Sequence, residues 1–147
     1  LGAGGACRAV IGALLESGVE KPHVTNRTQK RAIDLQVFFN NQIELIEWSE
    51  KEEFLNKVNT VINTTTLGMV GSDELQFSLS KANENTTIVD LVYNPINTPL
   101  LVEAHKKGCH VVNGIGMLLH QAIPGFNEWY GVKPTITKEL LNRVMSK

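Results

Sequence analysis

Residues 2–6 read Gly-Ala-Gly-Gly-Ala, and residues 8–17 follow with apolar side chains at helical spacing. A glycine-rich turn that opens a helix brings backbone N–H groups close to a pyrophosphate, and the helix N-terminus adds positive potential. Gly2, Gly4 and Gly5 fit this role. Because such a turn normally follows a β-strand, we expect a truncated first strand, in a fragment or the C-terminal part of a longer polypeptide.

The glycine pattern alone leaves two interpretations open. The third glycine of the Gly-x-Gly-x-x-Gly motif would fall at Cys7, so the motif is incomplete. Glycine-rich turns also occur where only packing requires them. The rest of the chain has to decide between a phosphate site and a structural turn.

Beyond the turn, extended and helical patterns alternate. Short apolar and β-branched runs predict strands at residues 22–26, 43–46, 60–63, 87–92 and 109–112. Apolar spacing and capping residues predict helices at residues 8–17, 29–40, 49–57 and 98–107, and after residues 116 and 137. Residues 64–85 are expected to be irregular. This alternation predicts an α/β fold of Rossmann type, a doubly wound parallel sheet with its first strand truncated.

The first helix carries a specific expectation about its buried face. Its spacing places Ala9, Val10, Ala13 and Leu14 on one side, and Gly18 stands where a left-handed residue would end it.

Other helix ends have recognisable signals. Thr98 and Thr137 are predicted N-caps, and Ser49 with Glu52 forms a Ser-x-x-Glu capping box. Pro124 is expected to break or kink the helix that starts after residue 116.

Composition narrows the class of protein. Over 147 residues, 42% are apolar, 20% are charged and the net charge is −1, so neither disorder nor nucleic-acid binding is indicated. Apolar runs are far shorter than the ~20 residues of a membrane span, and we expect a cytoplasmic protein with small-molecule partners and no membrane contact. Cys7 and Cys109 are expected to be free structural thiols. The four histidines show no metal-like spacing.

The segment after the second expected strand indicates which dinucleotide would bind. An NAD site usually has an acidic residue there, whereas this chain reads Asn26-Arg27-Thr28, with Arg31 one helical turn later. Two guanidinium groups and a hydroxyl suit a 2′-phosphate, which favours NADP over NAD. The alternative is that Arg27 and Arg31 are solvated surface residues.

These segments resemble the shikimate dehydrogenase family. The resemblance rests on residues 2–6, 26–31 and 63–69 (Asn-Thr-Thr-Thr-Leu-Gly-Met), on 90–95 (Asp-Leu-Val-Tyr-Asn-Pro) followed by Thr-Pro-Leu-Leu at 98–101, on 113–122 (Asn-Gly-Ile-Gly-Met-Leu-Leu-His-Gln-Ala), and on Phe126, Trp129 and Gly131. Six segments in the family's order cover most of the chain.

The resemblance implies a role for particular residues. The pyrophosphate would lie on Gly2, Ala3, Gly4, Gly5 and Ala6, and the 2′-phosphate on Asn26, Arg27, Thr28 and Arg31. The nicotinamide and its ribose would be bordered by Leu67, Leu91, Gly114 and Met117, while Tyr93 and Gln121 would reach the substrate. Without the resemblance, Gln121 could face solvent, Tyr93 could be a rim aromatic and Met117 could fill a core.

The family's reaction is reversible hydride transfer between NADPH and 3-dehydroshikimate, giving shikimate in aromatic amino-acid (chorismate) biosynthesis. Its Lys and Asp proton-transfer pair belongs to an N-terminal substrate domain, so we assign no catalytic residue here and expect these 147 residues alone to be inactive. Residues 1–131 would form the NADP-binding domain. Residues 132–147 would form a helix that packs on the substrate domain, leaving Leu140, Leu141 and Val144 exposed without it.

Two other interpretations remain. One is a related NADP enzyme, such as a quinate-using relative or a glutamyl-tRNA reductase; the Gln121 helix argues against the reductase, and the Asn-Arg-Thr segment against NAD-dependent quinate enzymes. The other is a non-catalytic NADP-binding module.

Overall fold

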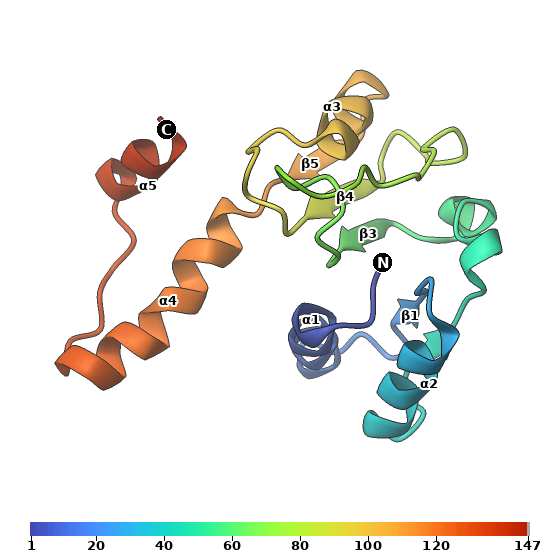
Figure 1. Cartoon of the computed structure of the whole chain (residues 1–147), viewed down its shortest axis with the longest axis horizontal. Coiled ribbons are helices and arrows are strands. Elements are labelled where there is room, and N and C mark those ends of the chain that lie inside the picture. The colour runs from blue at the N-terminus through green and yellow to red at the C-terminus, as the bar shows by residue number, and fades with distance from the viewer. Residues whose placement is uncertain (147) are drawn as a thin grey trace.

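The computed structural model describes residues 1–146 as two parallel sheets flanked by helices (Figure 1). β1 (His23–Val24) pairs with β2 (Glu44–Leu45), and β3 (Thr60–Asn63) pairs with β4 (Thr87–Asp90), which pairs with β5 (His110–Val112). Every pairing is parallel. Each strand lies within its predicted segment, so the expected α/β fold with a parallel sheet is confirmed.

Leu1 and Gly2 lie between the two sheets and bond to both. The Leu1 amino group donates to the Ile62 carbonyl at 2.7 Å, and the Thr64 N–H donates to the Leu1 carbonyl at 2.9 Å. On the other side, the Gly2 N–H donates to the Thr25 carbonyl at 2.9 Å. In a doubly wound sheet this place belongs to the strand that precedes the glycine turn, and here Leu1 and Gly2 occupy it.

The helices follow the predicted order. They are α1 (Gly5–Glu16), α2 (Gln29–Phe38), α3 (Pro99–Lys106), α4 (Ile115–Tyr130) and α5 (Lys138–Met145), with short 3₁₀ turns η1 (Trp48–Glu50) and η2 (Glu53–Lys57) after β2. The long connection from β3 to β4 contains neither helix nor strand, as expected.

Several helix ends confirm the predicted caps. Gly18 follows α1 with a φ of 88°, a left-handed conformation that glycine adopts without steric cost. The Thr98 hydroxyl accepts from the Leu101 N–H at 3.3 Å and the Thr137 hydroxyl from the Leu140 N–H at 3.2 Å. These two threonines therefore begin α3 and α5.

The predicted capping box was wrong. Ser49 lies inside η1, and Glu52 separates two 3₁₀ turns instead of starting one α-helix. The Glu52 carboxylate accepts from the Ser78 N–H at 3.0 Å, which is a distant backbone group, and not from the Ser49 N–H as a capping box requires. At Pro124 a break or a kink was expected, and α4 continues through this residue without a break.

The buried face of α1 also differs from the prediction. Cys7 and Ile11 are buried, whereas Ala9 and Ala13 are exposed and Val10 and Leu14 are half-buried. The reason is that α1 packs on the β1–β2 side of the molecule, in a cluster with Val24, Leu35 and Ile43. Two adjacent apolar stripes were available on this helix, and only the tertiary packing selects between them.

A second hydrophobic cluster surrounds β3 and β4. Its members include Leu55, Phe77, Leu79, Ile88 and Leu100. Cys109 belongs to it, Cys7 belongs to the α1 cluster, and both thiols are buried and unpaired, as expected.

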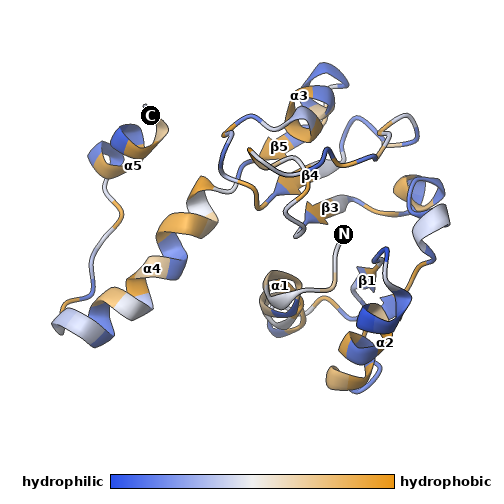
Figure 2. Cartoon of the chain, viewed as in Figure 1, coloured by the Kyte–Doolittle hydropathy of each residue, from blue (hydrophilic) through white to orange (hydrophobic). Residues whose placement is uncertain are grey.

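The C-terminal helices extend away from this body (Figure 1). Apolar residues are distributed along α4 (Figure 2), and Trp129 is 80% exposed and Tyr130 66%. On α5, Leu140 is exposed as expected, whereas Leu141 and Val144 are half-buried. None of the helices within residues 1–146 is both long and apolar enough to cross a membrane.

We predict that Gly114→Ala destabilises the protein. A Cβ at Gly114 would lie 2.7 Å from the Leu91 carbonyl carbon and 2.8 Å from the Val92 oxygen, and such overpacking costs about 1–3 kcal/mol. Gly116→Ala is the control, because no atom lies within 4 Å of its Cβ position and alanine favours a helix. Urea unfolding of both variants in the full polypeptide checks this, and equal stabilities would contradict it.

Candidate functional site

A cleft of about 760 Å³ opens at the carboxyl ends of β1 and β3, beside the glycine turn. Its lining includes residues 2–4 from the turn, 26–28 after β1 and 64–67 after β3. The strand order reverses between β1 and β3, and open parallel sheets bind ligands at such a switch point. The volume is within the range of small-molecule and cofactor sites.

Gly2 fits its place only as glycine. Its φ is 101°, and a Cβ there would lie 2.8 Å from the Thr64 Oγ1 and 2.9 Å from the Thr65 Cγ2. By contrast, a Cβ at Gly4 or Gly5 would meet no atom within 4 Å. Packing therefore accounts for Gly2, but it accounts for neither of the other two glycines.

The start of α1 offers donors toward an anion. Gly4 is the N-cap residue and makes no side-chain cap, and the first turn contains no acidic residue. The first N–H groups of a helix have no intrahelical acceptors, and the helix dipole places positive potential there. Gly5 and Ala6 belong to this first turn, next to the cleft-lining residues Gly2, Ala3 and Gly4.

Basic and hydroxyl side chains from one short segment lie beside the glycine turn. Asn26, Arg27, Thr28 and Arg31 all line the cleft, as predicted from the sequence. The Asn26 Nδ2 donates to the Thr28 carbonyl at 2.8 Å and so shapes this turn. Thr28 occupies the N-cap position of α2, but its hydroxyl accepts no capping hydrogen bond.

Arg27 and Arg31 carry exposed charges. Within residues 1–146, neither guanidinium forms an ion pair with a carboxylate. Arg8, on α1, differs from them because its guanidinium stacks on the Phe38 ring at 4.3 Å. Arg27 and Arg31 are thus the cations of this segment that face the cleft.

Trp48 and Lys51 were not predicted as site residues. They come from the 3₁₀ region after β2 and line the same cleft. The Lys51 ammonium lies 4.8 Å from the centre of the Trp48 ring and 3.5 Å from the Glu52 carboxylate, and its side chain is only 12% exposed. No local pattern marks these positions. Thr64, Thr65 and Thr66 were also missed, although they belong to a segment that carried the family resemblance.

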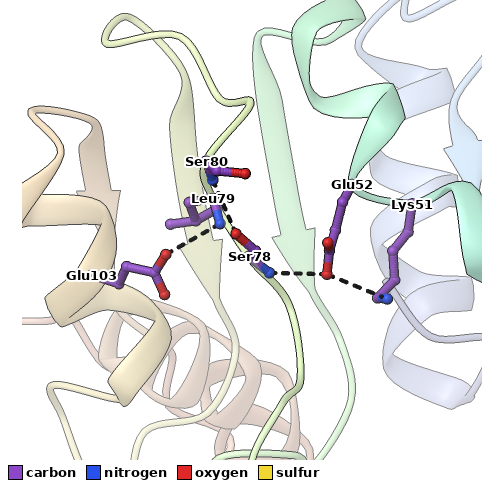
Figure 3. Close-up of polar contacts among 6 residues, drawn as sticks. All are labelled: Lys51, Glu52, Ser78, Leu79, Ser80 and Glu103. Carbon is purple, nitrogen blue, oxygen red and sulfur yellow. Dashed lines mark hydrogen bonds and ion pairs between the residues drawn. The ribbon is translucent and has the colours of Figure 1, made fainter.

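Asp73, Glu74 and Gln76, in the irregular β3–β4 connection, also line the cleft. Two carboxylates fix the residues that follow (Figure 3). Glu52 accepts from the Ser78 N–H at 3.0 Å, and Glu103 of α3 accepts from the Leu79 N–H at 3.2 Å. Side chains distant in sequence therefore hold a connection that has no sheet or helix bonds of its own.

The remaining predicted residues do not line the cleft. They are Gly5 and Ala6, at the start of α1, and Leu91, Gly114, Met117, Tyr93 and Gln121. Gly114 contacts the Leu91 backbone at the start of α4, and Met117 is half-buried one turn later. Tyr93 and Gln121 are exposed. Among the four residues that the resemblance places around the nicotinamide and its ribose, only Leu67 lies in the cleft lining.

The site shows no metal centre and no activated thiol. No group of three or more His, Cys, Asp or Glu residues that could hold a metal ion occurs within residues 1–146. Cys7 lies behind the glycine turn, where burial raises the pKa of its thiol. A thiol with a raised pKa stays protonated at neutral pH and is a poor nucleophile.

A family model and a similar protein of known name identify the same family for this chain. The family model described as Shikimate / quinate 5-dehydrogenase matches residues 1–108. A shikimate dehydrogenase (NADP(+)) from Roseobacter denitrificans is 49% identical over 137 residues, which are 93% of this chain and 50% of the relative. The chain thus spans about half the length of this relative.

Solved structures agree with the sequence match. Shikimate 5-dehydrogenase from Thermus thermophilus, in complex with NADP(H) and shikimate, has a TM-score of 0.80 at 32% identity, over 99% of this chain and 52% of that one. Quinate dehydrogenase from Corynebacterium glutamicum, in complex with NAD, has a TM-score of 0.84 at 30% identity, over 99% and 51%. These similarities confirm the Rossmann-type fold class.

We predict that Trp48 reports on binding in this cleft. A dinucleotide bound there changes the surroundings of Trp48, whereas Trp129 is 80% exposed on α4. Titration of the full polypeptide with NADP⁺ should therefore change tryptophan fluorescence in Trp129→Phe but much less in Trp48→Phe. A signal that disappears only with Trp129→Phe would place binding elsewhere.

Proposed function

The chain belongs to the shikimate / quinate 5-dehydrogenase family, and from this we propose that it is the NADP-binding part of an enzyme that interconverts shikimate and 3-dehydroshikimate. One observation carries the proposal: Arg27 and Arg31 line the same cleft as the glycine turn, so groups suited to a pyrophosphate and to a 2′-phosphate face one space. The Roseobacter denitrificans and Thermus thermophilus relatives are named for, or bound to, NADP.

The residues of the cleft fit such a cofactor. At Gly2 a Cβ would fill the space against Thr64 and Thr65, while Gly4 and Gly5 are exposed and their Cβ positions meet no atom, so the backbone at Gly4 and Gly5 is accessible to a pyrophosphate. We propose that Asn26, Arg27, Thr28 and Arg31 bind the 2′-phosphate, through a fork of guanidinium donors and a hydroxyl.

The nicotinamide would lie toward β4 and α4. We propose that Leu67, Leu91, Gly114 and Met117 border the nicotinamide ribose and ring. In support, Gly114 contacts Leu91 directly, which brings the start of α4 to the carboxyl end of β4. When bound, NADPH supplies the hydride, and the protein orients the reactants.

The substrate would be held jointly with another domain. We propose that Tyr93 and Gln121 provide a phenol and an amide for hydrogen bonds to a hydroxylated cyclohexene carboxylate. A preceding substrate domain would supply the Lys and Asp that transfer the proton. In this division residues 1–131 form the NADP-binding domain, and residues 132–147 pack on the substrate domain.

The expected cytoplasmic location also stays a proposal, which cell fractionation would test.

Quinate is the second candidate substrate. It is favoured by the similarity to a quinate dehydrogenase at a TM-score of 0.84, although that enzyme was solved with NAD. Steady-state assays of the full polypeptide with shikimate or quinate, each with NADP⁺ or NAD⁺, separate the candidates. Binding of NADPH without turnover of either substrate would indicate the third possibility, a non-catalytic module.

We predict that Arg27→Ala selectively weakens NADPH binding. Loss of one charge-assisted hydrogen bond of roughly 1.5–3 kcal/mol corresponds to about 10- to 100-fold in affinity, and NADH lacks the phosphate that makes this bond. Calorimetry on the full polypeptide measures both affinities. Lys30→Ala is the control, because it removes a nearby positive charge that does not line the cleft. Equal losses for NADPH and NADH would contradict the 2′-phosphate assignment.

Gln121→Ala should affect the substrate and spare the cofactor. Gln121 lies outside the cleft lining and on the exposed side of α4, so we expect near-normal NADPH affinity with a higher KM or lower kcat for shikimate. Asn127→Ala removes another exposed amide from the same helix and serves as the control. A defect confined to NADPH would refute the assignment of Gln121.

A further inference from the structure

Asp90, the last residue of β4, is a fully buried carboxyl group that accepts three hydrogen bonds. Its Oδ1 accepts from the Asn63 Nδ2 at 2.9 Å and from the Val92 N–H at 3.0 Å. Its Oδ2 accepts from the Thr98 hydroxyl at 2.6 Å. Asp90 and Thr98 are both 0% exposed, and neither lines the cleft. All three partners donate to this carboxyl group.

Asn63, the last residue of β3, connects Asp90 to the cleft. Its Oδ1 accepts from the Thr65 N–H at 3.1 Å and from the Thr65 hydroxyl at 2.7 Å. The same hydroxyl accepts from the Leu67 N–H at 3.2 Å, and the Asn63 Nδ2 lies 3.4 Å from the Leu67 carbonyl. Thr65 and Leu67 line the cleft. Residues 64–67, the cleft loop, are therefore folded around the Asn63 amide.

The orientation of this amide depends on Asp90. An asparagine side chain has donors on one side and an acceptor on the other, and a rotation of 180° exchanges them. In the rotated orientation, the amide oxygen would face the Asp90 oxygen, and the amide donors would face the Thr65 N–H. Both contacts would be repulsive in a buried place, where unpaired polar groups are costly. Asp90 thereby directs the Asn63 oxygen toward the cleft loop.

Thr98 fixes Asp90 from the other side. Its hydroxyl donates to Asp90 and accepts from the Leu101 N–H, so one side chain caps α3 and holds the carboxyl group. A continuous chain of hydrogen bonds runs from the N-terminus of α3 through Thr98, Asp90 and Asn63 to Thr65.

We propose that Asp90 is a positioning residue for cofactor binding, which sets the cleft loop through Asn63 and is itself oriented by Thr98. The proposal rests on the proposed function, because the cofactor is taken to be NADPH. Its consequence is that a threonine outside the cleft, at the start of α3, determines how tightly the cleft binds its ligand.

The first test is a set of threonine variants of the full polypeptide, with NADPH binding followed by fluorescence. Thr98→Val removes the hydroxyl and should weaken NADPH binding roughly tenfold, the scale of one hydrogen bond to a charged group. Thr98→Ser keeps the hydroxyl and should restore binding. Thr86→Val is the matched control, because Thr86 is also buried but its hydroxyl has no hydrogen-bond partner within residues 1–146. Thr137→Val controls for the loss of a helix cap elsewhere.

The second test is hydrogen exchange in Asp90→Asn. With an amide at residue 90, one end of the side chain donates instead of accepting, so residue 90 can no longer accept from both the Asn63 amide and the Thr98 hydroxyl, and the orientation of Asn63 is less strongly set. Exchange at the Thr65 and Leu67 amides should accelerate at least tenfold under folded conditions, while the amides of the β3–β4 ladder keep their protection. If Asp90 only stabilised the fold, its replacement would lower the protection from exchange throughout the sheet. The amides of the cleft loop would then be affected no more than those of the β3–β4 ladder.

The outcomes separate this inference from the proposed function. If the unmodified polypeptide binds NADPH and both Thr98→Val and Asp90→Asn bind it equally well, the positioning role is wrong and the proposed function stands. If Asp90→Asn does not fold, Thr98→Val against Thr86→Val decides alone. No NADPH binding by the unmodified polypeptide would refute the proposed function itself, and the inference with it.

Discussion

The close approach of Gly2 to both halves of the sheet is the contact on which the rest of the structure depends. Its N–H bonds to Thr25 beside β1, and its Cα packs against Thr64 and Thr65 after β3, where a side chain would not fit. Only glycine satisfies both this contact and a φ of 101°. Because α1 begins directly after this turn, the same constraint directs the helix N-terminus toward the cleft.

Buried and exposed polar groups have different tasks in this cleft. The Asn63 and Asp90 side chains are fully buried and have protein partners, so they hold the backbone of the cleft loop before any ligand arrives. Arg27 and Arg31 are exposed, and such side chains lose rotamer freedom when they bind. A pre-formed backbone with exposed charged side chains supports the proposal that the backbone sets the shape of the site and the guanidinium groups select the phosphate.

Gln121, expected to reach the substrate, lies on a helix that makes few contacts with the rest of the chain. α4 and α5 extend from the body (Figure 1), and α4 exposes the aromatic residues Trp129 and Tyr130. Exposed apolar surface of this kind usually marks an interface. Together with the observation that the chain spans about half the length of its relatives, this supports the proposal that another domain completes the substrate site.

The sequence alone determined the strand and helix order, the parallel sheet, the glycine turn and the segment containing Arg27 and Arg31, because each depends on local patterns in the chain. It could not determine which stripe of α1 is buried, since two neighbouring stripes are apolar and only packing on β1 and β2 selects one. It also misjudged Glu52, whose carboxylate bonds to Ser78, and it missed Trp48 and Lys51 in the cleft. These features depend on contacts between residues far apart in the chain, and such contacts exist only after the segments have packed together.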